Sequence, residues 1–358
     1  LANRAIELLG GQRGNYHIVH PNDHVNCGQS TNDIYPTCVK MTLYQASQGL
    51  LDGLDVLIGA LIERAKAFDG IVKMGRTQLQ DAVPIRLGQE FKAYSVAVMR
   101  DIRRMDKAME EMCTLNMGGT AIGTGINADE AYLRRIVPNL AEVSNMEFVQ
   151  AFDLIDATQN LDPFVAVSGA IKACAVTLSK IANDLRLMSS GPKAGFNEIN
   201  LPVRQNGSSI MPGKVNPVIP EVVNQVAFRV IGNDLTVTIA SEAGQLELNV
   251  MEPIIVHCLF ESIEMLINAM NTLREKCIAG ITANEEVCRR MVFNSIGLVT
   301  ALNPYLGYET SSMLAKEALK TGKGIYDLVL EHKLMSEEEL HKVLQPENMV
   351  HPRKKIGE

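Results

Sequence analysis

The segment GSSIMPGKVNP, residues 207–217, combines two adjacent serines, two glycines and a lysine. Hydroxyl groups donate and accept hydrogen bonds, and a lysine ammonium forms charge-assisted contacts with a carboxylate. Glycine leaves the backbone free to move. The residues before this segment, from Ser189 onwards, also lack a helical pattern, and long loops without regular structure are usually functional or disordered. The lysine, hydroxyls and amides favour a functional loop.

Other loops also concentrate polar groups. VNCGQSTNDIYPT, residues 25–37, carries four consecutive polar residues, Ser30, Thr31, Asn32 and Asp33. Taken alone, such a cluster directly before a helix is typical of an N-cap. GRTQLQDAVP, residues 75–84, supplies Thr77 and Gln78. NMGGTAIGTGIN, residues 116–127, is rich in glycine, but no strand precedes it and no GK[ST] follows, which favours a tight turn or close packing over a phosphate cradle.

Neither a metal site nor a serine hydrolase is indicated. His17, His20 and His24 are close in sequence, but Pro21 interrupts them and no pair of carboxylates or cysteines completes a ligand set. The sequence has no G-x-S-x-G segment on a strand-to-helix turn. We therefore predict no bound metal.

Long helices must position these loops. Strand-like alternation is absent over any long window, and five apolar runs are far longer than an average helix: 39–68, 87–113, 162–188, 217–243 and 250–279. The third and fourth runs are apolar on more than one face, so other helices must surround them. We predict an all-α fold built on a long five-helix bundle. Because apolar residues occupy several faces of these helices, packing against other subunits is favoured over a monomeric bundle with a large core.

A domain boundary is predicted near Gly280. The segment beginning at Thr282 has Glu285 at the spacing of a capping box, which predicts the start of a new helix. Ser336 and Glu339 form a second such pair. We therefore predict a central helical-bundle domain over residues 1–280 and a small helical C-terminal domain over 281–358.

Composition restricts the partners and the compartment. The 358 residues carry a net charge of −7, with no dense basic run before residues 353–355, which argues against nucleic acid as a partner. The seven cysteines stand singly, without a CxxC pair, which is typical of reduced thiols in the cytoplasm. Because no signal peptide or long uncharged apolar stretch is evident, we expect neither secretion nor membrane insertion.

Together, these loops resemble the aspartase/fumarase superfamily of lyases. GSSIMPGKVNP is similar to the signature loop of that family, and further segments of the chain match the family's motifs: GQSTND, GRTQLQDAVP, GGTAIGTGIN, NDLRLMSSGP and GQLELNVMEP. The resemblance covers essentially the whole chain. Gln78 stands where fumarases carry His, and residues 218–225 also resemble the aspartase branch. A class II fumarase acting on malate and fumarate is the alternative.

The resemblance implies an all-helical fold whose central domain is a five-helix bundle. Four subunits would form a homotetramer with a twenty-helix core, and each active site would take loops from three subunits. The family's N-terminal domain, which contributes a substrate-binding threonine, has no counterpart before Leu1. We therefore expect the chain as given to assemble but to have little or no activity. An inactive helical scaffold is a further alternative.

The implied reaction is the reversible anti-elimination that converts L-aspartate to fumarate and ammonia. It passes through a carbanion whose charge spreads into the side-chain carboxylate as an aci-carboxylate. By resemblance, Ser208 is the base, and the substrate-binding residues are Ser30, Thr31, Asn32, Thr77, Gln78, Lys214 and Asn216.

The roles differ among these residues. The resemblance implies that Ser30, Thr31 and Thr77 donate to the aci-carboxylate and that Asn32 lies near the departing amine. It also implies that Lys214 and Asn216 hold the other carboxylate. Glu221 is either structural or part of a proton relay, and the sequence leaves both open. No cofactor is implied, and a divalent cation such as Mg²⁺ would act only as an activator.

Overall fold

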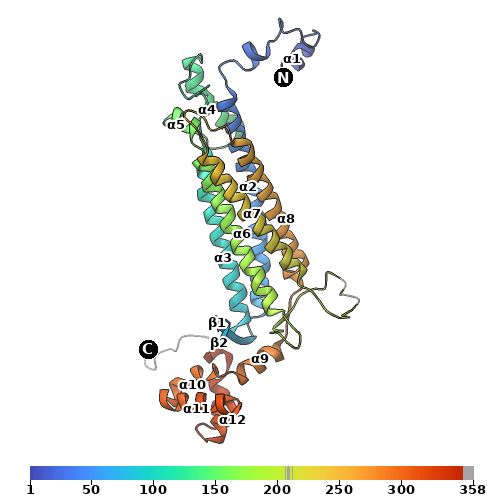
Figure 1. Ribbon diagram of the computed structural model, residues 1–358, viewed down its shortest axis with the longest axis vertical. Helices are drawn as coiled ribbons and strands as arrows, with labels where there is room; N and C mark the ends of the chain where they lie inside the picture. Colours follow the sequence, from blue (N-terminus) through green and yellow to red (C-terminus); the bar gives the residue numbers. More distant parts are fainter. Residues whose placement is uncertain (206, 208–209, 212, 350–358) are drawn as a thin grey trace. The chain divides into compact units, whose positions relative to one another are not determined.

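The computed structural model describes residues 1–205, 207, 210, 211 and 213–349, and its fold is mainly helical (Figure 1). The described helices besides the long ones are α1 (Ala2–Leu8), α4 (Glu130–Ser144), α5 (Leu154–Gln159), α9 (Glu285–Asn294), α10 (Leu298–Leu306), α11 (Tyr308–Thr321), α12 (Ile325–Glu331), α13 (Glu337–Val343) and α14 (Pro346–Met349). A π-helix spans Pro21–Val25, and 3₁₀ turns span Glu111–Cys113 and Ile278–Gly280. The predicted all-α class is confirmed.

Each of the five long apolar runs forms a helix. These helices are α2 (Thr31–Ala67), α3 (Leu87–Glu110), α6 (Asp162–Met188), α7 (Val218–Glu242) and α8 (Glu252–Lys276). α2 begins at Thr31 rather than at residue 39, because Ser30 and Asp33 cap it and Pro36 is tolerated inside the helix. The polar cluster of GQSTND therefore lies at the beginning of the longest helix.

The chain divides into two compact units, and each unit contains part of every long helix. Unit 1 comprises residues 1–53, 100–176 and 226–268, and unit 2 comprises 54–99, 177–225 and 269–358. In each unit the helical segments lie side by side (Figure 1). This division does not bear on the boundary at residue 280, which stays a prediction.

Buried polar contacts connect the helices of unit 1. Asp234 on α7 accepts hydrogen bonds from Ser168 and Lys172 on α6, at 2.8 and 2.6 Å. Asn233, also on α7, donates to Ser262 on α8 at 3.0 Å. Because Ser168, Asn233, Asp234 and Ser262 are buried, these bonds satisfy groups that would otherwise destabilise the bundle.

Unit 2 is held by aromatic and polar contacts. The rings of Phe68 and Phe91 meet edge to face at 5.3 Å between centroids, and Tyr94 on α3 donates to Asp184 on α6 at 2.9 Å. A separate apolar core gathers Met74 with buried residues of the helices that follow Gly280, among them Val292, Leu302, Leu314 and Leu328.

Three two-stranded sheets complete the described fold. In unit 2, β1 (Val72–Thr77) pairs antiparallel with β2 (Gln80–Arg86), and β5 (Ile199–Asn200) pairs antiparallel with β6 (Thr282–Ala283). In unit 1, β3 (Thr114–Leu115) pairs parallel with β4 (Val149–Gln150). GRTQLQDAVP is therefore a β-hairpin rather than a loop. The segment has too few apolar residues to show the alternation that predicts a strand from sequence.

The two predicted capping boxes have different outcomes. Ser336 and Glu339 form a capping box at the start of α13, as predicted. The new helix predicted near Thr282 is present as α9, but the capping box was wrong, because Thr282 and Ala283 pair with β5 and α9 begins at Glu285 without a side-chain cap. Pairing with the distant strand β5 therefore prevails over the local capping-box pattern.

Two segments of the described chain, Asp162–Met188 and Glu252–Gly280, are long and apolar enough to meet a length and hydropathy test for a membrane span. About half of the most apolar window of each is buried inside the protein. A core helix of a bundle meets the same test, because other helices surround it as lipid would.

Candidate active site

The N-terminus of α2 presents three of the predicted substrate residues. The Ser30 hydroxyl accepts a hydrogen bond from the backbone N–H of Asn32 at 3.2 Å, so Ser30 caps the helix. Its own hydroxyl proton is left to donate elsewhere. Thr31 is the first residue of the helix and is exposed. The positive end of the helix dipole favours an anion at this position.

Pro36 links this helix to the glycine-rich loop. A proline inside a helix has no N–H to donate to the carbonyl four residues earlier, which here belongs to Asn32. The Asn116 side chain donates to that carbonyl instead, at 2.9 Å. Asn32 in turn donates from its side-chain amide to the carbonyl of Ala121 at 2.7 Å. Its side-chain oxygen is therefore the atom that can face a departing amine.

Asp33 is a fully buried carboxylate that fixes the same loop. One oxygen accepts from the N–H of Ser30 at 2.9 Å, and the other accepts from Gly118 and Thr120 at 3.2 and 3.0 Å. Hydrogen bonds to an ionised group are stronger than neutral ones. Asp33 therefore positions the start of α2 against the glycine-rich loop. This role was not predicted, because the loop that Asp33 contacts lies 85 residues further along the chain.

The glycine-rich loop is packed tightly rather than shaped as a phosphate cradle. A Cβ added at Gly123 would lie 2.4 Å from the Cα of Ile155, and Gly123 has a φ of +93°. Both features require glycine. The loop thus supports the beginning of α2.

Thr77 and Gln78 lie at the turn of the β1–β2 hairpin. Thr77 pairs with Gln80, and the two residues between them, Gln78 and Leu79, have φ values of +52° and +60°. Two consecutive positive φ values define the turn type that suits the twist of a two-residue hairpin, although it usually carries Asn or Gly. Thr77 and Gln78 are both exposed. Such strained backbone is common at functional sites.

Lys214 and Asn216 line a pocket in unit 2. Its other lining residues come from the segment after α6, among them Ser189, Gly191, Asn197, Ile199 and Asn200. A Cβ at Gly207 would lie 2.8 Å from the Lys214 carbonyl oxygen, so the backbones of residues 207 and 214 pass each other closely. The predicted base, Ser208, and its neighbour Ser209 lie outside the described residues.

Glu221 lies in the first turn of α7, where the helix dipole favours a negative charge. One turn further on, the Asn224 side chain donates to the Ser179 hydroxyl at 2.8 Å and to the Asn183 side-chain oxygen at 3.1 Å. Asn224 is buried and thereby fixes the start of α7 on α6. Among the described residues, no hydrogen bond or ion pair of the Glu221 side chain distinguishes a relay from a structural role.

The structure places the predicted residues in two groups. Ser30, Thr31 and Asn32 belong to unit 1, whereas Thr77, Gln78, Lys214, Asn216 and Glu221 belong to unit 2. Within unit 2, the hairpin turn and the Lys214 pocket are separate features. The exposure of Thr31, Thr77 and Lys214 leaves their polar groups available to a substrate.

The histidine cluster forms local contacts. His24 Nδ1 accepts from the N–H of His20 at 2.7 Å, and His20 Nδ1 accepts from Asn22 and Asp23. Within the described ranges, no group of three His, Cys, Asp or Glu side chains could hold a metal ion.

A buried lysine lies near the beginning of α8. The Lys40 ammonium donates to the Thr114 carbonyl at 2.7 Å and lies 6.0 Å from the centre of the Phe164 ring. Burial lowers the pKa of Lys40 to about 8, against the opposing effect of Glu252. Burial also raises the pKa of Glu252 to about 7.

This environment predicts a pH-dependent stability. Between about pH 8 and 10.5 the folded protein binds fewer protons at Lys40 than the unfolded chain, so the free energy of unfolding should increase with pH. Lys40 contributes about 3 kcal/mol at most to this increase in the free energy of unfolding. Below pH 8 the cost of burying the charged Lys40 ammonium is present in full. Lys40→Met should remove the increase, as measured by urea denaturation at pH 8 and pH 10. The exposed Lys316→Met is the control, and parallel profiles for Lys40→Met and the wild type would contradict the prediction.

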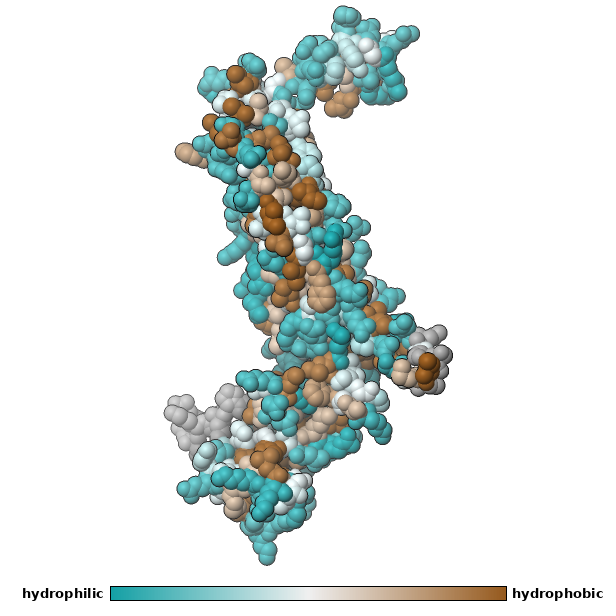
Figure 2. Space-filling view, viewed as in Figure 1, coloured by the Kyte–Doolittle hydropathy of each residue, from teal (hydrophilic) through white to brown (hydrophobic). Residues whose placement is uncertain are grey.

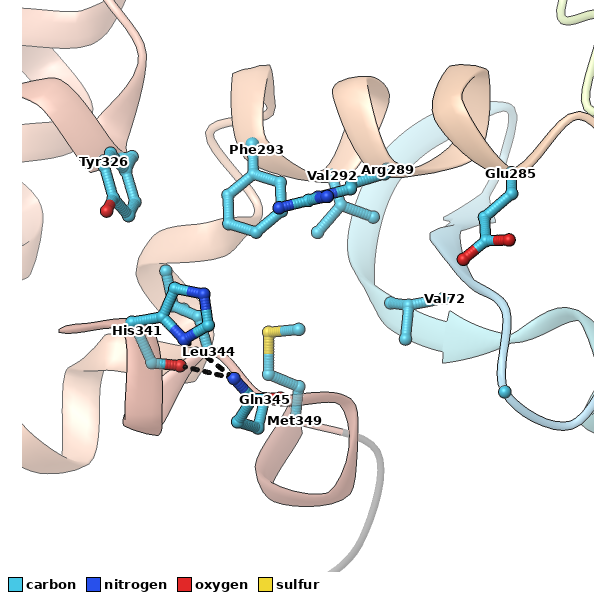
Figure 3. Close-up of a pocket in the computed structure, with 11 residues that line it drawn as sticks. Val72, Glu285, Arg289, Val292, Phe293, Tyr326, His341, Leu344, Gln345 and Met349 are labelled. Atoms are coloured by element: carbon cyan, nitrogen blue, oxygen red, sulfur yellow. Dashed lines mark hydrogen bonds between the residues drawn. The ribbon is translucent and has the colours of Figure 1, made fainter. Parts of the chain in front are cut away.

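A further pocket lies in unit 2 among the helices after Gly280 (Figure 3). The Arg289 guanidinium lies 5.6 Å from the centre of the Phe293 ring, and Gln345 donates to the His341 carbonyl at 3.2 Å. The lining of this pocket includes both acidic and basic side chains, and none of the predicted site residues lines it.

Comparison with known proteins identifies the class. The family described as Lyase matches residues 1–232, and the one described as Fumarase C C-terminus matches residues 298–351. The chain belongs to the aspartase/fumarase superfamily of lyases, as the loop motifs predicted.

The sequence relatives are more specific. The chain is 56% identical to the aspartate ammonia-lyase of Helicobacter pylori (strain ATCC 700392 / 26695), over 98% of this chain and 75% of the relative. It is 52% identical to the aspartate ammonia-lyase of Escherichia coli (strain K12), over 98% of this chain and 74% of the relative.

Solved structures share the fold. A fumarate lyase:delta crystallin from Brucella melitensis, bound to cobalt, superposes with a TM-score of 0.94 at 48% identity, covering 98% of this chain and 76% of that one. A recombinant class II fumarase from Schistosoma mansoni gives 0.91 at 34% identity, covering 99% and 77%.

Proposed function

We infer that this protein is an aspartate ammonia-lyase, which converts L-aspartate to fumarate and ammonia. The observation that carries this inference is identity of 50–56% to curated aspartate ammonia-lyases over at least 98% of the chain. Identity to the class II fumarase is lower, at 34%. Fumarases carry His at the position of Gln78, so this residue also favours an aspartate ammonia-lyase over a fumarase.

The chemistry explains the types of residue in the site. A base must remove a weakly acidic proton from the carbon next to the side-chain carboxylate. The electron pair then spreads into that carboxylate, and the carbon–nitrogen bond breaks as fumarate forms and ammonia leaves. Preorganised donors around the developing aci-carboxylate would lower the barrier, and a fixed cation would hold the other carboxylate.

We assign the base to Ser208 and the aci-carboxylate donors to Thr31, Thr77 and Ser30. The exposed hydroxyl of Thr31 at the positive end of α2 supports its part of this assignment. Asn32 would contact the amine through its side-chain oxygen, and Gln78 would contact substrate from the hairpin turn. Because a serine is a poor base in water, the loop 207–217 would have to close and exclude solvent.

Assembly into a homotetramer, with active sites shared between subunits, is part of the proposal. α7 exposes Phe228, Ile231, Leu235 and Ile239 at a spacing that puts them on one helix face. Figure 2 shows apolar side chains exposed among polar ones on the long helices. Exposed apolar surface costs roughly 25 cal/mol per Å², so a second copy is the expected cover. Light scattering should give a tetramer, and a monomer would contradict the proposal.

We also propose that the enzyme works in the cytoplasm without a cofactor. All seven cysteines are free, and four of them are buried. Free thiols are typical of a reducing compartment. The reaction involves no redox change, and the hydroxyl and ammonium groups of the site can supply its acid–base chemistry. A divalent cation would act only as an activator.

The substrate can be tested directly. The full-length protein should be incubated separately with L-aspartate, L-malate and argininosuccinate while the absorbance of fumarate is recorded. We expect fumarate from L-aspartate and no appreciable turnover of malate. Faster turnover of malate than of aspartate would overturn the inference in favour of a fumarase.

Lys214→Ala should chiefly weaken substrate binding. The change removes one charge-assisted contact, worth about 1.5–3 kcal/mol, from the carboxylate that does not take part in the chemistry. We expect KM for L-aspartate to rise by about 10- to 100-fold with a smaller change in kcat. Steady-state kinetics would decide this, with the exposed Lys193→Ala as a control in the same loop region. A fall in kcat at unchanged KM would contradict the binding role.

A further inference from the structure

Four charged side chains form a cluster in unit 2, in which Lys73 and Glu198 are buried and Arg76 and Glu90 are partly buried. Glu198 has no exposed side-chain surface, and its two oxygens lie 2.6 Å from Arg76 Nη1 and 2.8 Å from Lys73 Nζ. Lys73 is also buried and donates to both oxygens of Glu90, at 3.0 and 2.9 Å. The cluster thus balances two cations with two carboxylates. Its members come from β1, α3 and the segment after α6.

Glu198 is also fixed through its backbone. Its N–H donates to the Met188 carbonyl at 2.8 Å, and its own carbonyl accepts from the N–H of Asn284 at 2.8 Å. The residues on either side, Asn197 and Ile199, line the pocket that contains Lys214 and Asn216. The position of Glu198 therefore sets one wall of that pocket.

Arg76 connects the same carboxylate to the hairpin. It directly precedes Thr77, and its guanidinium lies 4.0 Å from the centre of the Phe196 ring. It also donates to the Met74 carbonyl at 3.2 Å. Arg76 therefore holds the end of β1 against the segment that carries Glu198. A buried carboxylate that contacts both cations restrains both substrate-binding features of unit 2.

We propose that Glu198 is a positioning residue that fixes the hairpin turn, with Thr77 and Gln78, and the wall of the Lys214–Asn216 pocket relative to each other. This proposal rests on the proposed lyase function. Removing its charge leaves the buried Lys73 with Glu90 as its remaining carboxylate and takes the carboxylate away from the partly buried Arg76, which is costly in a low-dielectric site. The hairpin and the pocket wall would then shift, and a displacement of about 1 Å can lower a rate about 100-fold.

Glu198→Gln tests the proposal, with Glu90→Gln as the matched control. Both changes remove one carboxylate from Lys73, but the ion pair of Glu90 among the described side chains is with Lys73, whereas Glu198 also pairs with Arg76 and lies between two residues that line the pocket. We expect Glu198→Gln to lower kcat/KM for L-aspartate by about 10- to 100-fold and Glu90→Gln by less than about threefold. Amide hydrogen exchange should become faster at residues 76–80 and 196–201 in Glu198→Gln while the long helices stay protected.

Three outcomes would overturn the proposal. They are kinetics of Glu198→Gln within about twofold of wild type, equal losses in the two variants, or unchanged exchange at both segments. If Glu198→Gln fails to fold, Arg76→Lys provides the second variant, because it keeps the charge but changes the contacts with Glu198 and Phe196. A full-length wild-type protein without aspartate turnover would instead contradict the proposed function, and the exchange measurement would still test the positioning role.

Discussion

Ser208→Ala should abolish lyase turnover and leave the helical fold and the assembly intact. A general base typically contributes about 10²–10⁴-fold, and a base that removes so weakly acidic a proton can contribute more. Alanine removes the only titratable atom of the side chain. Initial rates of fumarate formation from L-aspartate would measure the loss, and circular dichroism with light scattering would check the fold and the tetramer.

Ser209→Ala is the matched control, because it makes the same atomic change at the adjacent residue. We expect a much milder effect, since a supporting or capping role fits Ser209 better. Equal activity of the two variants would show that the base is assigned wrongly.

Thr31→Val should lower kcat by about 10²–10³-fold, the usual loss when one preorganised donor to a developing oxyanion is removed. Valine has nearly the shape of threonine, and Ser30 rather than Thr31 caps the helix, so the start of α2 should keep its structure. Some activity should persist, because Ser30 and Thr77 are the other two proposed donors.

Thr42→Val is a control on the same helix. Thr42 is exposed, and its hydroxyl donates to the Cys38 carbonyl at 2.8 Å, away from the helix terminus. We expect wild-type kinetics for Thr42→Val. If Thr31→Val also kept its kcat, the N-terminus of α2 would not bind the carboxylate that develops the charge.

The two groups of site residues are supported by similar devices. In unit 1, the buried Asp33 carboxylate accepts three backbone N–H groups and fixes the start of α2. In unit 2, the buried Glu198 carboxylate contacts two cations beside the hairpin and the Lys214 pocket. Substrate-binding groups on exposed loops need such support, because a loop by itself holds geometry poorly. The support residues explain why the exposed residues can act with defined positions.

The sequence by itself determined the helical class, the five long helices and the loops to which the chemistry is assigned in the proposal. Apolar residues recur every few positions along each of these helices, so the pattern is local and predicts a helix without knowledge of tertiary contacts. The polar motifs are local as well, and their combination was specific enough to indicate the superfamily.

Only the tertiary structure decided how these loops are held. Asn116 reaches a carbonyl 84 residues away that Pro36 leaves free, and Arg76 meets Glu198 across 122 residues. The positive φ values of Gln78 and Leu79 depend on pairing between β1 and β2, and Thr282 pairs with Asn200 instead of capping α9. Such contacts join residues whose local sequence carries no sign of the partner, so the sequence could propose substrate-binding side chains but could not show the buried charges beside them.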